Sequence, residues 1–311
     1  MASLARKIFR QLPAPARDKI KRWVVPKLVS FAQQYEAVPH MLLENEVTAS
    51  AAKFETSHYQ IPVLLRLLAL GRFTSVKGAR VCEIGGDGNF GIARLWHDLT
   101  GTPVVVSNPM PETAYSDEEL ASMGVSLCRK PFEETPVADD SFDIIYGCAV
   151  MEHIVPMREF FAYAFEKLAP GGWVIIHGCP LWHCYIGHHA YVRCDGINYF
   201  MGQPDCPVPD FAHLYMDEKE MHAHLTQEKG LPEAHAGALC HQIYRSDYLN
   251  RLTIADICAA IAASPWQEMR FATDLDYTAH VARDFLASKQ LSVKDVQRGT
   301  LYLAVKKPDY L

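Results

Sequence analysis

Histidines are concentrated in residues 177–200, a segment that reads HGCPLWHCYIGHHAYVRCDGINYF. The four histidines are His177, His183, His188 and His189, and Cys179, Cys184 and Asp195 lie near them. Because imidazole titrates near neutral pH, a histidine here is suited to take a proton from the hydroxyl oxygen of an acceptor, meaning a substrate that receives a transferred group. Converging histidines and carboxylates also bind metal ions. A third interpretation is that these side chains satisfy backbone groups and do no chemistry.

The spacing of the histidines matches no established zinc pattern, so we assign none of them as a metal ligand. The three interpretations, a general base, a metal site and a structural role, stay open. His188 and His189 are adjacent and would point to opposite sides of a strand. Both follow Gly187 in an aromatic-rich turn, and one of the two is the favoured general base. His153, in the segment VMEHI, is a further catalytic candidate on the side of the acceptor.

A glycine-rich segment, VCEIGGDGNFG at residues 81–91, is typical of a strand that enters a tight turn and then a helix. Glycine tolerates positive φ and lets the backbone approach a ligand closely. Asp87 and Asn89 stand where a regular pattern would place glycines, but these residue types are the next most tolerant of that conformation. We therefore expect the turn to form, with Asp87 either capping the following helix or facing an ammonium group.

Strands and helices alternate on both sides of this turn. The predicted strands are 79–85, 102–108, 125–132, 141–149 and 173–178. The predicted helices begin at residue 58 and end near Gly71, span 90–99, and begin at residue 157 and are stopped by Pro170-Gly171-Gly172. A helix at 253–264 and strands at 267–273 and 300–307 close the chain. This alternation predicts a doubly wound α/β sheet with right-handed crossovers.

The stretch between the fifth strand and residue 265 is rich in His, Pro, Gly and Tyr and is too long for a loop in a compact domain. We interpret residues 179–265 as an inserted cap that binds the acceptor. The core is then 56–178 together with 266–311, preceded by a basic helical arm at 1–55.

Charge divides the chain. Residues 1–30 carry a net charge of +7 and the remainder −13, for −6 overall. The acidic body argues against a nucleic-acid partner, since phosphate binding needs clustered Lys and Arg. The basic, amphipathic arm is compatible with a helix docked on the domain, with peripheral contact to an anionic membrane, or with a transit peptide. Nine scattered cysteines without a CxxC pair indicate a reducing, cytoplasmic location.

Three segments, VCEIGGDGNFG, ETPVADDSFDIIYGCAVMEHI and FEKLAPGGWVIIHG, resemble in order the motifs of class I S-adenosylmethionine-dependent methyltransferases. The resemblance covers about residues 78–178 and implies a seven-stranded Rossmann-like sheet whose last strand is antiparallel. It also implies S-adenosyl-L-methionine as the cofactor. The cofactor-binding residues it indicates are Glu83, Gly85, Gly86, Asp87, Gly88, Asn108, Phe132, Glu133 and Cys148, with Phe132 and Glu133 flanking the adenine.

The chain departs from the family at Asn108, where an acid usually accepts bonds from the ribose hydroxyls. A neutral amide in place of a carboxylate predicts cofactor affinity weaker by about tenfold. A Rossmann dehydrogenase is the competing interpretation, because Gly86-x-Gly88-x-x-Gly91 fits the dinucleotide-binding pattern. The acid that such a protein has after its second strand is also missing here, and the LAPGG segment is left unexplained.

The sequence therefore predicts a cytoplasmic methyltransferase, with O-methylation favoured, that acts on a small-molecule or saccharide-like (glycan) hydroxylated acceptor. Two alternatives remain: a non-catalytic partner protein with the methyltransferase fold, and a metal-dependent enzyme that uses the histidine-rich insertion. The oligomeric state is left open.

Overall fold

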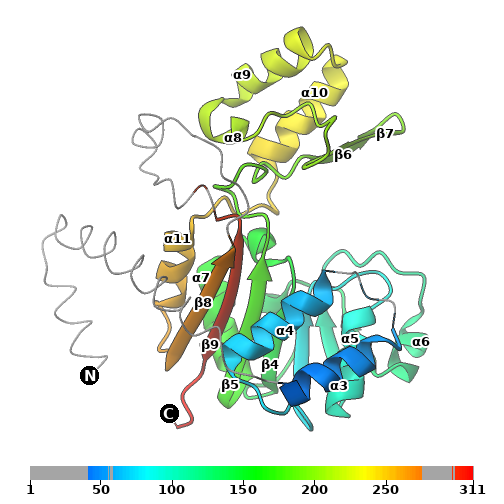
Figure 1. Cartoon of the computed structure of the whole chain (residues 1–311), viewed down its shortest axis with the longest axis vertical. Helices are drawn as coiled ribbons and strands as arrows, with labels where there is room; N and C mark the ends of the chain where they lie inside the picture. Colours follow the sequence, from blue (N-terminus) through cyan, green and yellow to red (C-terminus); the bar gives the residue numbers. More distant parts are fainter. Residues whose placement is uncertain (1–40, 55, 57–58, 275–295, 297, 311) are drawn as a thin grey trace, which may run out of the picture.

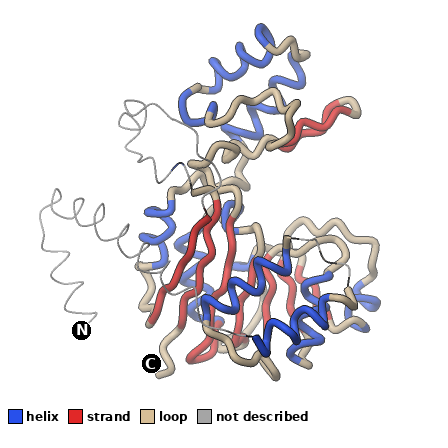
Figure 2. The backbone as a smooth tube through the Cα atoms, in the orientation of Figure 1, coloured by secondary structure: helices blue, strands red, loops and turns tan. Residues whose placement is uncertain are grey.

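The computed structural model describes residues 41–54, 56, 59–274, 296 and 298–310. A sheet with helices packed against it forms the larger part of the described chain, and a smaller unit stands beyond one end of the strands (Figure 1). Figure 2 shows that the strands of the large sheet lie side by side, whereas a separate two-stranded hairpin belongs to the smaller unit.

The large sheet has seven strands in the order β3-β2-β1-β4-β5-β9-β8. Their bounds are β1 (Val81–Ile84), β2 (Val104–Ser107), β3 (Val125–Cys128), β4 (Phe142–Gly147), β5 (Leu168–Gly178), β8 (Glu268–Asp274) and β9 (Thr300–Lys306). The first five are parallel, and β9 lies antiparallel between β5 and β8. The predicted doubly wound sheet with one antiparallel strand is confirmed.

Helices cover both faces of this sheet. On one face lie α3 (Met41–Ala51), α4 (Gln60–Gly71) and α5 (Gly91–Thr100), and on the other α7 (Met157–Lys167) and α11 (Ile254–Ile261). A capping box at Ser116 starts the short α6 (Asp117–Ser122), which leads into β3. Each face has its own apolar cluster, so the sheet is buried on both sides, as its continuous apolar strands require.

Two predicted elements were wrong in their bounds. The third strand stops at Cys128 and is followed by a 3₁₀ turn, η1 (Phe132–Glu134), because Pro131 offers no N–H for the ladder. The helix predicted to run from residue 157 to the stop at Pro170 ends earlier, at Lys167, and the LAPGG segment opens β5. Pro170 cannot continue a helix, and this segment pairs with the chain that follows β9 through Gly171 N–H to the Pro308 carbonyl, 3.0 Å.

The insertion folds into a unit with its own apolar cluster, which includes Met221, Leu225, Leu239 and Ile243. Its elements are β6 (Tyr191–Cys194), β7 (Ile197–Phe200), α8 (Ala212–Tyr215), α9 (Glu218–Ala223), α10 (Glu233–Cys240) and two π-helical turns, η3 (His224–Glu228) and η4 (His241–Arg245). Helix α11 contacts α7 and shares its cluster, so this part of 179–265 belongs with the sheet and not with the cap.

The basic residues of the predicted arm, within 1–30, lie outside the described residues. The described end of the arm is α3, whose Leu43 and Val47 are buried in the cluster that α4 and α5 share. This part is a helix docked on the domain. Among the described residues, no helix combines the length and the apolar character needed to cross a membrane.

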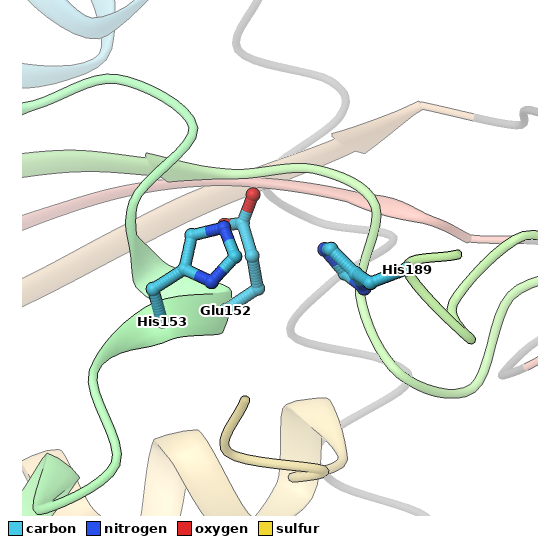
Figure 3. A group of neighbouring side chains, drawn as sticks. All are labelled: Glu152, His153 and His189. Atoms are coloured by element: carbon cyan, nitrogen blue, oxygen red, sulfur yellow. The ribbon is translucent and has the colours of Figure 1, made fainter. Parts of the chain in front are cut away.

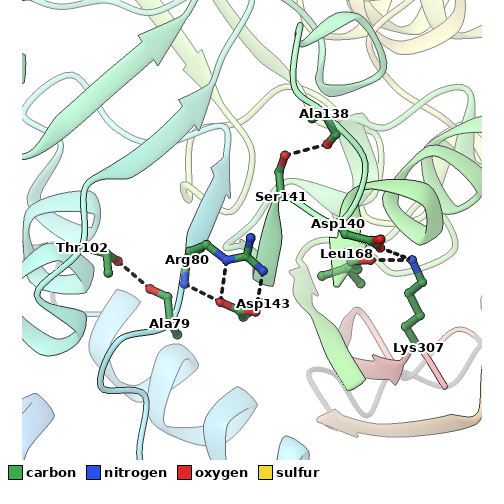
Figure 4. A network of polar contacts seen from close by, with 9 residues as sticks. All are labelled: Ala79, Arg80, Thr102, Ala138, Asp140, Ser141, Asp143, Leu168 and Lys307. Atoms are coloured by element: carbon green, nitrogen blue, oxygen red, sulfur yellow. Dashed lines mark hydrogen bonds and ion pairs between the residues drawn. The ribbon is translucent and has the colours of Figure 1, made fainter. Parts of the chain in front are cut away.

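Polar contacts tie the amino-terminal edge of the sheet together (Figure 4). Arg80, just before β1, makes a bidentate pair with Asp143 of β4 at 2.9 and 3.1 Å. Lys307, just after β9 and only 3% exposed, donates to Asp140 at 2.9 Å and to the Leu168 carbonyl at 2.5 Å. These contacts hold the strand starts in register at the edge opposite to the predicted site.

We expect Lys307→Ala to lower the free energy of unfolding by about 1.5–3 kcal/mol, because it leaves the Leu168 carbonyl without this donor. Lys306→Ala is the matched control, since Lys306 pairs with Asp309 at the surface and such pairs contribute about 0–1 kcal/mol. Urea unfolding of both variants measures the difference. Equal losses in the two variants would contradict this account of Lys307.

Candidate active site

The strand order reverses between β1 and β4, and the segments that leave these two strands are brought together there. In an open α/β sheet, ligands bind beyond the carboxyl ends of the strands at such a switch point. The glycine-rich turn follows β1, and the segment from Cys148 to His153 follows β4. A Cβ at Gly85 would lie 3.4 Å from the Val150 side chain, so the two segments are in contact.

The glycines of the turn are required by its geometry. Gly85 and Gly86 have φ angles of 84° and 88°, in the region that L side chains rarely adopt. Gly88 has no room for a side chain, because a Cβ there would lie 2.0 Å from the Glu112 carbonyl oxygen. The turn therefore presents bare backbone at its first two residues and packs tightly at the third.

Asp87 and Asn89 turn toward the start of α5. Both side-chain Oδ1 atoms accept from the Gly91 N–H, at 3.3 and 3.0 Å, and Asp87 Oδ2 also accepts from Gln60 Nε2 at 3.2 Å. The expectation that Asp87 caps the following helix is confirmed. The polar residues that replace glycine are thus used locally and stabilise the turn.

Glu83 is the most unusual group of the turn. Its side chain is 3% exposed, and its Oε2 has no hydrogen-bond partner among the described residues. Burial, followed by the charge of Asp87, raises the pKa of Glu83 to about 8. A buried carboxyl without a partner is costly, and such groups in folded proteins call for an explanation. A cationic or hydrogen-donating ligand at this point would supply one.

The other residues expected around the cofactor take different positions. Asn108 donates to the Gly86 carbonyl at 3.4 Å and accepts from the Met110 N–H at 2.9 Å, so it braces the turn. Phe132 is 2% exposed and packs in the core against Phe160 and Tyr163, with ring centroids 5.4 and 5.1 Å apart. Glu133 is partly buried, and burial raises its pKa.

Cys148 follows β4 and is also partly buried. Burial is the main cause that raises the pKa of its thiol to about 12. The thiol is therefore protonated at neutral pH and is no nucleophile there. Its neighbour Ala149, at φ 51°, donates its N–H to His177 Nδ1 at 3.1 Å, which fixes the exit of β4 against the end of β5.

Two of the three predicted catalytic histidines come together, with an acid that the sequence analysis did not select (Figure 3). Ligand atoms of Glu152, His153 and His189 all lie within 4.8 Å of one another. Glu152 and His153 belong to η2 (Met151–His153) after β4, and His189 comes from the insertion. The rings of His153 and His189 meet edge to face, 5.3 Å apart.

The electrostatics of this cluster follow from its burial. Burial lowers the pKa of His189 to about 4 and also lowers the pKa of His153. Burial raises the pKa of Glu152, which is 2% exposed, to about 8. Both imidazoles are therefore neutral at pH 7 and each has a lone pair available.

The third candidate, His188, is directed elsewhere. It is 1% exposed, its Nδ1 accepts from the Ala190 N–H at 3.0 Å, and its ring lies 5.5 Å from that of His213. His177 and His183 likewise bond to backbone groups. The interpretation that these histidines satisfy the backbone fits these three, whereas His153 and His189 form the cluster.

Sequence reasoning missed Glu152 and the residues around the cluster. Glu152 stands directly before His153 in the MEH segment, and this adjacency is the one signal that could have identified it. The carbonyl of Tyr248 accepts from His153 at 3.1 Å. Gln242 donates to the His189 carbonyl at 3.3 Å and to the Tyr248 hydroxyl. No feature of the sequence indicated either Tyr248 or Gln242. These two residues are brought in by the tertiary fold alone.

Comparison with known proteins gives one family match. Residues 86–176 match the family model described as "Methyltransferase domain". The ubiquinone biosynthesis O-methyltransferase of Azorhizobium caulinodans is 28% identical over 104 residues, which is 32% of this chain and 40% of that protein. The match therefore spans less than half the length of that curated relative.

Solved structures of methyltransferases are also similar. An S-adenosylmethionine-dependent methyltransferase from Mesorhizobium loti has a TM-score of 0.44 and 13% identity, covering 78% of this chain and 96% of that one. Phosphoethanolamine N-methyltransferase 2 of Haemonchus contortus, in complex with S-adenosyl-L-methionine, has a TM-score of 0.44 and 14% identity, covering 78% and 52% of the two chains.

The burial of Glu83 gives a testable pH dependence. Its pKa in the folded chain, about 8, lies above the ordinary 4.5, so its contribution to stability is fully present below about pH 4.5 and is lost as the pH rises to about 8. We expect the wild type to lose up to about 1.4 kcal/mol per pH unit relative to Glu83→Gln across this window. Urea unfolding at several pH values, without added ligand, measures it.

Glu118→Gln, on the exposed surface of α6, is the control and should show no such window. A constant difference between the wild type and Glu83→Gln from pH 5 to pH 8 would mean that Glu83 is not buried as a neutral acid.

Proposed function

We propose that the chain is a class I S-adenosylmethionine-dependent methyltransferase and that it methylates an oxygen atom of a small hydroxylated acceptor. One arrangement carries the proposal: at the sheet's switch point, a glycine turn lies beside the buried Glu83, whose Oε2 has no hydrogen-bond partner among the described residues, and a polar cluster follows the neighbouring strand. The first feature suits the methyl donor and the second suits an acceptor hydroxyl.

The residues of the turn fit S-adenosylmethionine, which supplies an electrophilic methyl group on a positively charged sulfur. Gly85 and Gly86 leave the backbone bare, and the unpartnered Oε2 of Glu83 is placed to accept from an ammonium group. Such a contact would stabilise the ionised form of Glu83 and offset the cost of its burial. Asn108 and Asp87 hold the turn in this shape through their own hydrogen bonds.

On the acceptor side, we assign His153, His189 and Glu152 to the reacting hydroxyl. The neutral imidazoles orient that hydroxyl and assist the loss of its proton, which makes the oxygen nucleophilic. Methyl transfer is an in-line displacement, so alignment of the oxygen with the donor's methyl group is the main task of the protein. The thioether leaves uncharged, and no acid is needed for it.

Polar and aromatic groups around the cluster favour a hydroxylated acceptor. Gln242 and the ring of Tyr248, 5.5 Å from the ring of His153, stand beside it. The similar protein from Azorhizobium caulinodans is named an O-methyltransferase of ubiquinone biosynthesis, which supports an oxygen acceptor. A saccharide-like acceptor and peripheral membrane contact through the basic arm remain proposals.

Calorimetry with S-adenosylhomocysteine tests the donor site. We expect binding in the micromolar range by the wild type, about 10- to 100-fold weaker binding by Glu83→Gln, which loses a charge-assisted bond, and unchanged binding by Glu118→Gln. No binding at millimolar ligand would favour the alternative of a non-catalytic partner protein.

Turnover tests the acceptor side. With a panel of catechols and simple sugars as acceptors, formation of S-adenosylhomocysteine reports methylation. For the best acceptor, we expect His189→Ala to lower kcat by about 10²–10⁴-fold while leaving affinity for S-adenosylhomocysteine within a factor of about two. His222→Ala is the matched control, because His222 of α9 pairs with Glu233 of α10, away from the cluster. Undiminished kcat in His189→Ala would remove this residue from the proposed mechanism.

A further inference from the structure

We propose that Glu152, His153 and His189 bind one divalent transition-metal ion, for which zinc is the best match, with an open coordination position for the acceptor's oxygen. The role of the ion in catalysis rests on the proposed function, whereas the binding site itself does not. Two histidines and one carboxylate with one open position are a recurrent ligand set of catalytic zinc. The three side chains come from two segments that are separated by β5 in the sequence.

The hydrogen bonds of the two imidazoles prepare them as ligands. Nδ1 of His189 lies 2.9 Å from the Gly187 carbonyl, and Nδ1 of His153 lies 3.1 Å from the Tyr248 carbonyl. A carbonyl oxygen only accepts, so each Nδ1 is protonated and each Nε2 carries the lone pair. Histidines that bind metals are oriented in this way, by donating the other ring N–H to a backbone carbonyl or a carboxylate.

His189 has a buried nitrogen atom that a metal ion would satisfy. Its side chain is 4% exposed, and its Nε2 has no hydrogen-bond partner among the described residues. Buried nitrogen atoms without partners are rare in folded proteins. In Figure 3, the His189 ring lies across from Glu152 and His153, so this lone pair belongs to the cluster and not to a separate environment.

Glu152 completes the set and is held in place. One oxygen, Oε2, accepts from the Cys179 N–H at 3.2 Å, and the Asn250 N–H donates to the Glu152 carbonyl at 3.0 Å. Among the described residues, Glu152 makes no ion pair or hydrogen bond with either imidazole of the cluster. The three side chains therefore lie close together, and Glu152 is not hydrogen-bonded to either imidazole. Small side-chain rotations would place their nitrogen and oxygen atoms about 2.0–2.2 Å from one ion.

The site lies where such an ion would act on an acceptor. Val150, which contacts the glycine turn at Gly85, is two residues before Glu152, so the cluster and the donor side share one segment. A bound cation lowers the pKa of a coordinated hydroxyl. With both Nε2 atoms bound to the ion, the imidazoles assist the loss of the hydroxyl proton through the ion and do not take the proton themselves. The proton passes to water, the oxygen forms its bond to the methyl carbon, and the electron pair of the carbon–sulfur bond stays on sulfur.

Metal content and cobalt substitution test the site. The full chain is purified, treated with chelator, reloaded with Zn²⁺ or Co²⁺ and dialysed. We expect about one ion per chain by plasma mass spectrometry, and a Co²⁺ absorption spectrum without the intense bands that thiolate ligands produce. That spectrum separates this site from adventitious binding to the cysteines.

Variants then assign the ligands. Glu152→Gln keeps the shape of the side chain and His189→Ala removes an imidazole, and each should weaken Zn²⁺ affinity at least tenfold. His222→Ala should not change it. Circular dichroism checks folding, and Glu152→Gln decides the matter if His189→Ala fails to fold. Less than about a tenth of an ion per chain, or unchanged affinity in both ligand variants, would overturn the proposal.

The same preparations separate the two proposals. If S-adenosylhomocysteine binds but no ion does, the metal site falls and the methyltransferase function stands. If the ion binds but S-adenosylhomocysteine does not, the metal site stands and the proposed function falls.

Discussion

The structure depends on how the chain leaves β1 and β4, two neighbouring parallel strands, at the point where the strand order of the sheet reverses. Helices that follow the two strands pack on opposite faces, so the backbone that leaves each strand is not covered by its own helix. The glycine turn and the segment through His153 both occupy this position. That geometry places Glu83 on the donor side and Glu152 and His153 on the acceptor side, whereas the insertion brings His189 to them.

Burial, more than any ion pair, sets the chemistry of the site. Glu83 and Glu152 are both removed from water, and burial raises the pKa of each to about 8, while it lowers the pKa of His189 to about 4. These groups are costly to a folded chain unless ligands satisfy them. A cationic donor beside Glu83 and a cation among Glu152 and the two histidines would each offset such a cost, which is why we assign both sides of the site to ligand binding.

The sequence was sufficient for most of the core. Apolar strands, helix periodicity and the order of three motifs predicted the seven-stranded sheet and the antiparallel last strand. They also predicted the turn at Gly85 and Gly86, because these signals are local. The errors lie where local signals compete: Pro131 ends β3 early, and the LAPGG segment joins the sheet through contacts with residue 308, which no short window contains.

The candidate site was only half predictable for the same reason. Histidine content identified the segment around His189, but only the path of the insertion decides that His189 meets His153 while its neighbour His188 turns to His213. The role of Asn108 as a brace of the turn also depends on its distance to the Gly86 carbonyl, which residue type alone does not give.

A crystal structure with S-adenosylhomocysteine at saturating concentration would test the account most directly. The account predicts the nucleoside beyond the end of β1, the ligand's ammonium within about 3.2 Å of a Glu83 oxygen, and its sulfur facing the segment after β4. A ligand bound elsewhere, or a turn whose Asp87 and Asn89 side chains swing away from α5 and fill that volume, would contradict it.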